Sequence, residues 1–320
     1  MSKGAQRWGL LLPQGAHLEL AGVDPARAWG HVLDAAAEAE RLGYGSVWTI
    51  DRSETLPRRE PEPVFDSWTA LAAVAQRTER IGLGHLGPGA PFRDPALLAK
   101  RAATLDVMSG GRMELALEPT GHPSEHRAHG VPVPDPAVRR AALAETVEAL
   151  RLLWTRQRVS SEGEHVVLDQ AFSSPKPANG GIRLHVHEDA VEAVPAQAVD
   201  GVLWQAPPEV VRAGVETFRK RCEAAGADPD AVEHAVLLES RIFDTEDERD
   251  RWLATPHVVI FWSEHPDLYM RRNLVGTVDA VRDRVRAYLD AGARRFLVWF
   301  RDYPELTSAR RFMSEVVAWL

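Results

Sequence analysis

The chain has 320 residues, of which 45% are hydrophobic, and a formal net charge of −8 at pH 7. This length suits a barrel domain, and the apolar fraction is enough to fill its core. The acidic balance offers no basic surface to nucleic acid or to anionic membranes, and no apolar run reaches membrane-spanning length. Cys222 is the single cysteine, which excludes an intrachain disulfide and a thiolate metal cluster. Because the start also lacks a signal-peptide layout, we expect a cytoplasmic protein.

Short apolar runs alternate with segments of helical spacing along the whole chain. The clearest pair is a helix opened by Asp94 and Pro95 and ended by Gly110, followed by the apolar run 113–117. Strands are expected at 8–12, 46–50, 81–85, 113–117, 183–187, 201–204, 234–238 and 296–300. Helices are expected at 25–42, 66–78, 95–109, 139–154, a short stretch ending at 199, 208–225, 277–291 and 308–320.

Eight alternations of strand and helix predict a closed (β/α)8 TIM barrel. A doubly wound sheet is the alternative, but it would usually offer a glycine fingerprint after the first strand, and Leu12-Pro-Gln-Gly has none. No linker or composition break divides the chain, so residues 1–320 are expected to form one domain. Loop insertions are expected at 86–93, 118–136 and 254–274, with a small hairpin between 159 and 168 outside the barrel.

Four segments carry a resemblance to a known family: 66–84, 91–117, 276–281 and 296–300. The amino-acid motifs of these segments resemble the luciferase-like monooxygenase superfamily, in particular its deazaflavin-dependent oxidoreductase branch. The similarity is weakest between residues 182 and 274. The resemblance implies a barrel that holds a reduced deazaflavin or flavin (FMN) at its strand ends. It also implies oxidoreductase or monooxygenase activity on a small organic metabolite, and a homodimer.

Residues that follow the strands of a TIM barrel line its active-site face, and here they are rich in imidazoles and carboxylates suited to proton transfer. His185 and His187 share one face of a strand, which is the minimum for a metal site, but no metal site is assigned. The rim residues are Gln14, His17, Asp51, Arg52, His85, Glu118, His122, His187, Glu188, Asp189, Trp204, Gln205, Glu239 and Arg241. The catalytic candidates are Asp51, Arg52, His85, Glu118, His122 and His187. The candidates for cofactor contact are His85, Glu118, Gly121, His187, Glu188 and Asp189.

The chain departs from the family pattern at the positions that the resemblance places beside the cofactor. The scaffold motifs match, whereas four strand ends have changed together. The usual Asp-His is Asp51-Arg52, the usual threonine is His85, the usual Gly-Ala-Gly-Trp is replaced from Glu118 to His122, and the usual glycines are His187-Glu188-Asp189.

The change after the fifth strand bears on phosphate binding. A glycine loop at a helix N-terminus offers bare N–H groups to a phosphate, whereas Glu188 and Asp189 bring negative charge. Unit charges about 4 Å apart repel by roughly 4 kcal/mol at an effective dielectric near 20. We therefore expect cofactor binding to be weak or absent unless Arg183 or another arginine compensates. In the alternative, both carboxylates cap the helix and point to solvent.

Arg52 stands where the resemblance puts a histidine beside the reacting atoms. A guanidinium stays charged and cannot act as a general base, so Arg52 is expected to bind an anionic group or to stabilise developing negative charge. Proton transfer is then expected from His85 or His187, since each ends a strand and should point into the cavity.

Three functions remain open from the sequence. The first is an oxidoreductase that moves a hydride between a deazaflavin or flavin and a small organic substrate. The second is a cofactor-independent acid–base enzyme, such as an isomerase, cyclase or lyase, on the same barrel. The third is a non-catalytic partner subunit.

Overall fold

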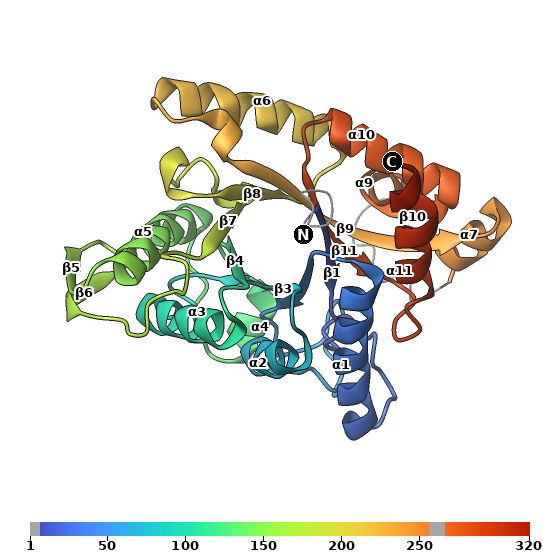
Figure 1. Cartoon of the computed structure of the whole chain (residues 1–320), viewed down its shortest axis with the longest axis horizontal. Coiled ribbons are helices and arrows are strands. Elements are labelled where there is room, and N and C mark those ends of the chain that lie inside the picture. Colours follow the sequence, from blue (N-terminus) through green and yellow to red (C-terminus); the bar gives the residue numbers. More distant parts are fainter. Residues whose placement is uncertain (1–6, 256–265) are drawn as a thin grey trace.

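The computed structural model describes residues 7–255 and 266–320, and these form a closed parallel barrel (Figure 1). Neighbouring strands pair in parallel around the ring, and β8 pairs with β9 to close it. The predicted TIM barrel is therefore confirmed. Its strands are β1 (Trp8–Leu11), β2 (Ser46–Ile50), β3 (Gly82–Pro88), β4 (Met113–Glu118), β7 (Arg183–His187), β8 (Gly201–Trp204), β9 (Glu233–Phe243) and β11 (Arg295–Phe300).

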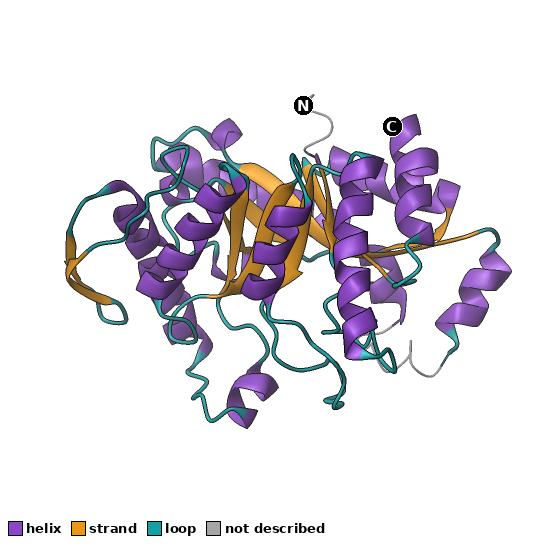
Figure 2. Cartoon of the chain, turned by 60° about the horizontal axis from the view of Figure 1, so that its bottom comes forward, coloured by secondary structure: helices purple, strands orange, loops and turns teal. Residues whose placement is uncertain are grey.

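Helices cover the outside of the barrel, as Figure 2 shows. Asp94 caps α3 by accepting from the N–H of Leu97, and Gly110 ends that helix in the left-handed conformation at φ 73°. None of the helices described has the length and apolarity that a membrane span requires. The long outer helices are α1 (Pro25–Leu42), α2 (Ser67–Arg77), α3 (Pro95–Ser109), α5 (Pro136–Thr155), α6 (Pro208–Ala224) and α10 (Val278–Asp290).

Two of the predicted helices differ in form. The one expected to end at 199 consists of two short 3-10 turns, η2 (Glu188–Ala190) and η3 (Ala196–Ala198). The closing helix is α-helical only in α11 (Thr307–Arg311) and then continues as π- and 3-10 turns. The fifth strand is therefore followed by no long helix.

Several elements lie outside the repeating strand–helix unit. The predicted hairpin is confirmed as β5 (Val159–Glu162) and β6 (Val167–Ala171), at the left edge of Figure 1. β9 is longer than expected, and beyond the barrel it pairs with β10 (Leu274–Thr277). Short helices that the sequence reading did not anticipate are α4 (Pro123–Ala128), α7 (Glu246–Leu253) and α9 (Pro266–Arg272).

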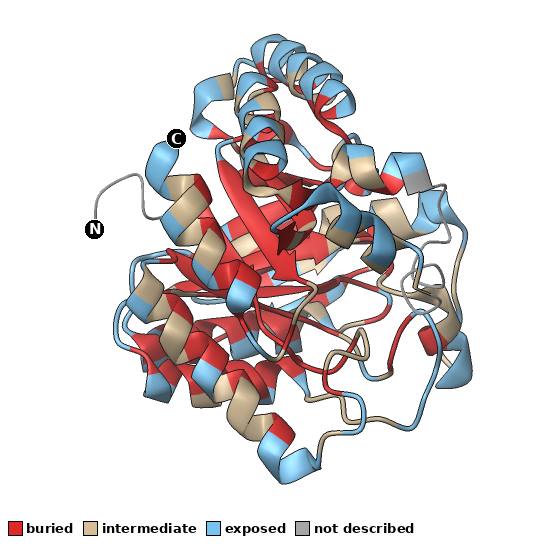
Figure 3. Cartoon of the chain, turned by 90° about the vertical axis from the view of Figure 1, so that its right-hand side faces the viewer, coloured by how far each residue is buried: buried red, intermediate tan, exposed pale blue. Residues whose placement is uncertain are grey.

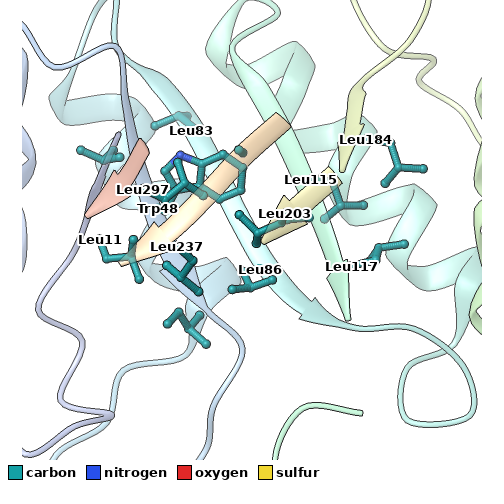
Figure 4. Packing of buried hydrophobic residues seen from close by; sticks show 14 of the residues in the cluster. Leu11, Trp48, Leu83, Leu86, Leu115, Leu117, Leu184, Leu203, Leu237 and Leu297 are labelled. Carbon is teal, nitrogen blue, oxygen red and sulfur yellow. The ribbon is translucent and has the colours of Figure 1, made fainter. Parts of the chain in front are cut away.

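The centre of the barrel is filled by one indole and a layer of leucines (Figure 4). Trp48 is 1% exposed, and a Cβ on Gly84 would lie 2.0 Å from its ring. A Cβ on Gly9 would lie 2.7 Å from Leu297. Glycine at these two positions makes the space that the indole occupies. The strands in Figure 3 are accordingly almost entirely buried, while the helices expose their outer faces.

Candidate active site at the carboxyl ends of the strands

The carboxyl ends of the strands enclose a cavity of about 100 Å³, called here the mouth cavity. Its floor is apolar and is formed by Leu11, Ile50, Leu86, Leu237 and Trp299. A side pocket of about 320 Å³ adjoins it, and His17 and Trp299 line both. The polar side chains that line the mouth cavity are His17, Arg52, Glu118, His187, Gln205 and Glu239.

Arg52 and Glu118 form a largely buried ion pair at the mouth. Arg52 Nη1 donates to Glu118 Oε1 at 3.1 Å and to the carbonyl of Asp51 at 3.1 Å, and the two side chains are 12% and 16% exposed. Arg52 Nε is buried and finds no acceptor among the described residues. Gly121 takes a φ of 69°, and its Cβ would lie 3.2 Å from Arg52 Nη1. The loop after β4 thus needs glycine to pass this close to the guanidinium.

Asp51 is held by Arg93 in a two-pronged contact. Arg93 Nε donates to Oδ2 at 2.8 Å and Nη2 donates to Oδ1 at 3.0 Å. Burial raises the pKa of the Asp51 carboxyl, but the bonds from Arg93 outweigh it and the net pKa is lowered. Asp51 therefore stays charged and positions the strand end, and it does not line the mouth cavity.

His187 lines the mouth cavity with its tautomer set by the backbone. Its Nδ1 accepts from the N–H of Asp189 at 3.3 Å, so the neutral ring carries its proton on Nε2. The Asp189 carboxylate lies 3.5 Å from the same Nδ1 and is 70% exposed. His187 therefore presents a donor rather than a base to the cavity, and its catalytic role stays a prediction.

His85 does not point into the mouth, contrary to the prediction. The side chain is fully buried between β3 and α2, where Nε2 and Ser67 Oγ are 3.0 Å apart and the ring stacks on Trp68 at 4.0 Å. Burial lowers the pKa of His85 to about 4. The reason is strand parity: Gly84 faces the indole inside the barrel and Leu86 lines the mouth, so the residue between them faces outward.

His122 lies beside the mouth without lining the cavity. Its Nδ1 is 2.8 Å from Ser124 Oγ at the start of α4. Burial and, after it, the positive charge of Arg52 lower the pKa of His122. The ring is therefore close enough for the charge of Arg52 to affect its pKa, but its hydrogen bond to Ser124 holds it in the loop.

The two acids after β7 point in different directions. Glu188 Oε1 accepts from the N–H of Gln205 at 3.0 Å, and burial raises the pKa of this carboxyl. Asp189 is exposed, so the alternative in which both carboxylates face solvent holds for Asp189 alone. Arg183 cannot compensate these charges, because it lies at the opposite end of β7 and pairs with Glu233 at 3.0 Å.

Other rim residues are structural. Gln14 ties the loop after β1 to β2, since its Oε1 accepts from the N–H of Ile50 at 2.6 Å. Trp204 faces outward, where it donates to His234 Nδ1 at 3.2 Å. Arg241 lies over the rings of Phe243 and Trp252. Within the described residues, no group of three or more His, Cys, Asp or Glu side chains could hold a metal ion.

On the side of the mouth formed by β9 and β11, the sequence pattern predicts Glu239 as a rim residue but not Trp299, Tyr269 or Arg301. Glu239 Oε2 accepts from Tyr269 Oη at 2.7 Å and lies 3.3 Å from Arg301 Nε. The ring of His17 meets Trp299 edge-on at 3.6 Å. Strand parity could have found Trp299 as the last inward residue of β11, but Tyr269 comes from a helix that the sequence pattern does not reveal.

Known proteins resemble the chain over most of its length. A family model described as luciferase-like monooxygenase matches residues 9–266. An F420-dependent glucose-6-phosphate dehydrogenase of Intrasporangium calvum is 35% identical over 152 residues, which are 46% of this chain and 45% of the relative. The enzyme of the same name in Nakamurella multipartita is 31% identical over 228 residues, 68% of this chain and 65% of the relative. The chain thus spans about half the length of the first of these relatives.

Solved structures share the whole barrel. An F420-dependent secondary alcohol dehydrogenase in complex with an F420-acetone adduct is 22% identical, with a TM-score of 0.80 over 98% of both chains. The EDTA monooxygenase from Chelativorans sp. BNC1 is 18% identical, with a TM-score of 0.79 over 98% of this chain and 93% of that one. At these identities the likeness shows the fold, while the F420-dependent relatives support the predicted deazaflavin branch. Because the family model covers most of its length, the chain belongs to the luciferase-like monooxygenase family.

Proposed function

We propose that the protein is an oxidoreductase that transfers a hydride between a weakly bound deazaflavin or flavin and a small organic substrate at the mouth cavity. The observation that carries this proposal is the mouth itself. An apolar floor with one indole meets two fixed donors, Arg52 and His187, at the end of the barrel where this fold places its chemistry.

The described residues suit one part of such a cofactor better than the other. The apolar floor and Trp299 suit a flat ring system, and the side pocket of about 320 Å³ extends the space beside it. The phosphate part finds Glu188 and Asp189 after β7, with no long helix N-terminus there. Ligand pockets usually measure about 300–1,000 Å³, and the mouth cavity alone is smaller. These features support weak binding.

When bound, the deazaflavin or flavin supplies or accepts the hydride. The chain's own residues bind and orient. His187 Nε2–H donates to a substrate oxygen and stabilises negative charge that develops on it, and Arg52 fixes an acceptor group of the substrate. The leucine floor excludes water from the reacting atoms, and Arg93 keeps Asp51, and with it the strand end that carries Arg52, in place.

A second candidate is the cofactor-independent acid–base enzyme. The small volume of the mouth cavity favours it, since about 100 Å³ takes a small metabolite more readily than a tricyclic cofactor. Glu118 would then be the general base, because it is the carboxylate in contact with Arg52 at the cavity wall. A non-catalytic subunit and the homodimer stay predictions from the family resemblance.

Spectroscopy of the purified protein, followed by titration with reduced and oxidised deazaflavin and FMN, tests the proposal. We expect no bound chromophore, dissociation constants above the low micromolar range, and oxidation of the reduced cofactor with a panel of small carbonyl compounds. A stoichiometric low-micromolar complex would contradict weak binding. Absence of hydride transfer with either cofactor would overturn the oxidoreductase and leave the acid–base enzyme.

A further inference from the structure

The side-chain groups of the mouth cavity that remain available for hydrogen bonds are donors. Among the described residues, Arg52 Nε and Trp299 Nε1 are buried without an acceptor. His187 adds Nε2–H, because its Nδ1 is occupied by the Asp189 backbone. All three side chains line the same cavity. A buried donor without a partner is costly, so a ligand whose acceptor reaches one of these donors gains a hydrogen bond.

The carboxylates of the mouth are already engaged by donors of the chain. Glu118 accepts from Arg52 Nη1, and Glu239 accepts from Tyr269 Oη with Arg301 beside it. Neither residue has a buried oxygen without a hydrogen bond. A ligand of the mouth cavity is therefore expected to carry a hydrogen-bond acceptor. It does not have to carry a cation, because Glu118 and Glu239 already have donors within the chain.

The free edge of Arg52 selects the kind of acceptor. Nη1 holds Glu118 and the Asp51 carbonyl, which leaves the edge formed by Nε and Nη2. Two parallel N–H groups on one guanidinium edge match the two oxygens of a carboxylate. A phosphate would need donors for more oxygens, and Arg52 is the sole arginine or lysine among the described residues that line the mouth cavity.

His17, which lines the same cavity, adds no negative charge that would oppose an anion. Burial lowers the pKa of His17 well below its usual value, and Arg301 and Arg52 lower it further. His17 therefore stays neutral and offers no competing charge.

We propose that the substrate is a small organic acid whose carboxylate binds the Nε–Nη2 edge of Arg52, with its carbon chain on the leucine floor and Trp299. This proposal rests on the proposed function in one respect, which is that the mouth cavity is the substrate site. It assigns to that site a substrate class, and it assigns to Arg52 the role of a specificity-determining residue.

Calorimetric titration without any cofactor tests the proposal. Butyrate and butyramide have the same size, but only butyrate offers two charged oxygens. We expect butyrate to bind the wild-type protein at least about tenfold more tightly than butyramide, and more tightly than inorganic phosphate. Equal binding of butyrate and butyramide would overturn the proposal, as would tighter binding of phosphate.

Variants locate the binding. Arg52→Gln is expected to abolish the preference for butyrate, and Arg52→Lys is expected to lose most of it because an ammonium lacks the planar edge. Arg80→Gln is the matched control, since Arg80 borders a pocket at the opposite end of the barrel and is 64% exposed. A preference that survives Arg52→Gln, or that disappears in Arg80→Gln, would contradict the assignment.

Glu118→Gln keeps the proposal testable if Arg52→Gln does not fold. Removing the charge of Glu118 frees Arg52 from its competing anion, so butyrate should bind roughly three- to tenfold more tightly. Unchanged or weaker binding would count against the proposal. Because no cofactor is present, failure here overturns the carboxylate site alone, whereas failure of hydride transfer overturns the proposed function with this site intact.

Discussion

The two ends of the barrel both contain buried arginines paired with glutamates, but the pairs are completed differently. At the amino ends of the strands, Arg295 is 3% exposed and its Nη1 and Nε each lie 2.7 Å from a carboxylate, of Glu114 and Glu233 respectively. At the mouth, Arg52 makes one contact of 3.1 Å to Glu118 and leaves Nε unpaired within the described structure. We call the group of Arg183, Arg295, Glu114 and Glu233 the floor network. It lies at the opposite end of the barrel from the apolar floor of the mouth cavity.

The difference separates a structural ion network from a binding one. In the floor network burial raises the pKa of Glu114, yet Arg295 outweighs it and lowers the pKa to about 2, so the charges compensate one another within the chain. At the mouth the compensation is incomplete. An arginine with an edge to spare is able to take a ligand, whereas an arginine with both edges engaged holds strands together.

The largest expected effect comes from breaking the floor network. Arg295→Met leaves Glu114 without its arginine and Glu233 with Arg183 alone, and we expect the free energy of unfolding to fall by about 3–5 kcal/mol. Urea denaturation measures the change, with the exposed Arg41→Met as control. A loss below about 1 kcal/mol would mean that the floor network is no more structural than the mouth.

The buried His85 is expected to make the stability of the protein depend on pH. His85 has a pKa of about 4 in the folded protein against 6.5 for the free side chain, so the unfolded chain takes up a proton first as pH falls. Stability is therefore full above pH 6.5 and declines between pH 6.5 and 4, by about 3 kcal/mol for this group. His85→Gln should remove that part of the decline in denaturation measurements. If its pH dependence equals that of the wild type, the outward His85 is not responsible.

Arg52→Ala is expected to act on the reaction rather than on the fold. Once a substrate is identified, kcat/KM should fall about 100-fold and Arg52→Lys should keep part of the activity, because a dry site depends strongly on one fixed positive charge. The loss of unfolding free energy should be smaller than for Arg295→Met. His187→Ala should lower kcat/KM because it removes the Nε2–H donor, and His85→Gln should leave kcat/KM unchanged. Wild-type turnover in both Arg52 variants would contradict the view that Arg52, unlike the arginines of the floor network, binds the substrate.

The smallest effect concerns the acids after β7. The double variant Glu188→Gly with Asp189→Gly removes two negative charges and releases the N–H of Gln205, which now donates to Glu188. Affinity for reduced deazaflavin or FMN should rise about tenfold, as measured by fluorescence titration. Unaltered affinity would remove the electrostatic explanation for weak binding and leave the cavity volume as its cause.

The barrel could be predicted because its information is local. Apolar runs bounded by capped helices gave β2, β7 and β8 with the bounds that the structure shows. The additions beyond the repeat could not be found in this way. α7 reads Glu-Asp-Glu-Arg-Asp-Arg-Trp-Leu and contains no buried residue, so no hydrophobic period marks it.

The site was predicted at the level of the strand ends but not of each side chain. Strands of a parallel barrel are apolar on both faces, so their sequence does not tell which residues face inward. For β3 the expected end at His85 falls three residues before Pro88, and only the contact of Gly84 with Trp48 fixes the alternation. Arg52 and His187 were placed correctly beside the cavity because they follow or end strands whose bounds were predicted correctly.

The Trp48 side chain closes the interior of the barrel below the mouth cavity. Its indole, with the leucine layer and the buried ring of His185 beside it, fills the axis between the floor network and the mouth cavity. Water consumed at the mouth therefore has to arrive from the carboxyl side, through the same entrance as the substrate. A bound substrate that covers this entrance would cut off its own supply of exchangeable protons. Proton transfer during turnover would then rely on His187 and Glu118, because Arg52 stays charged.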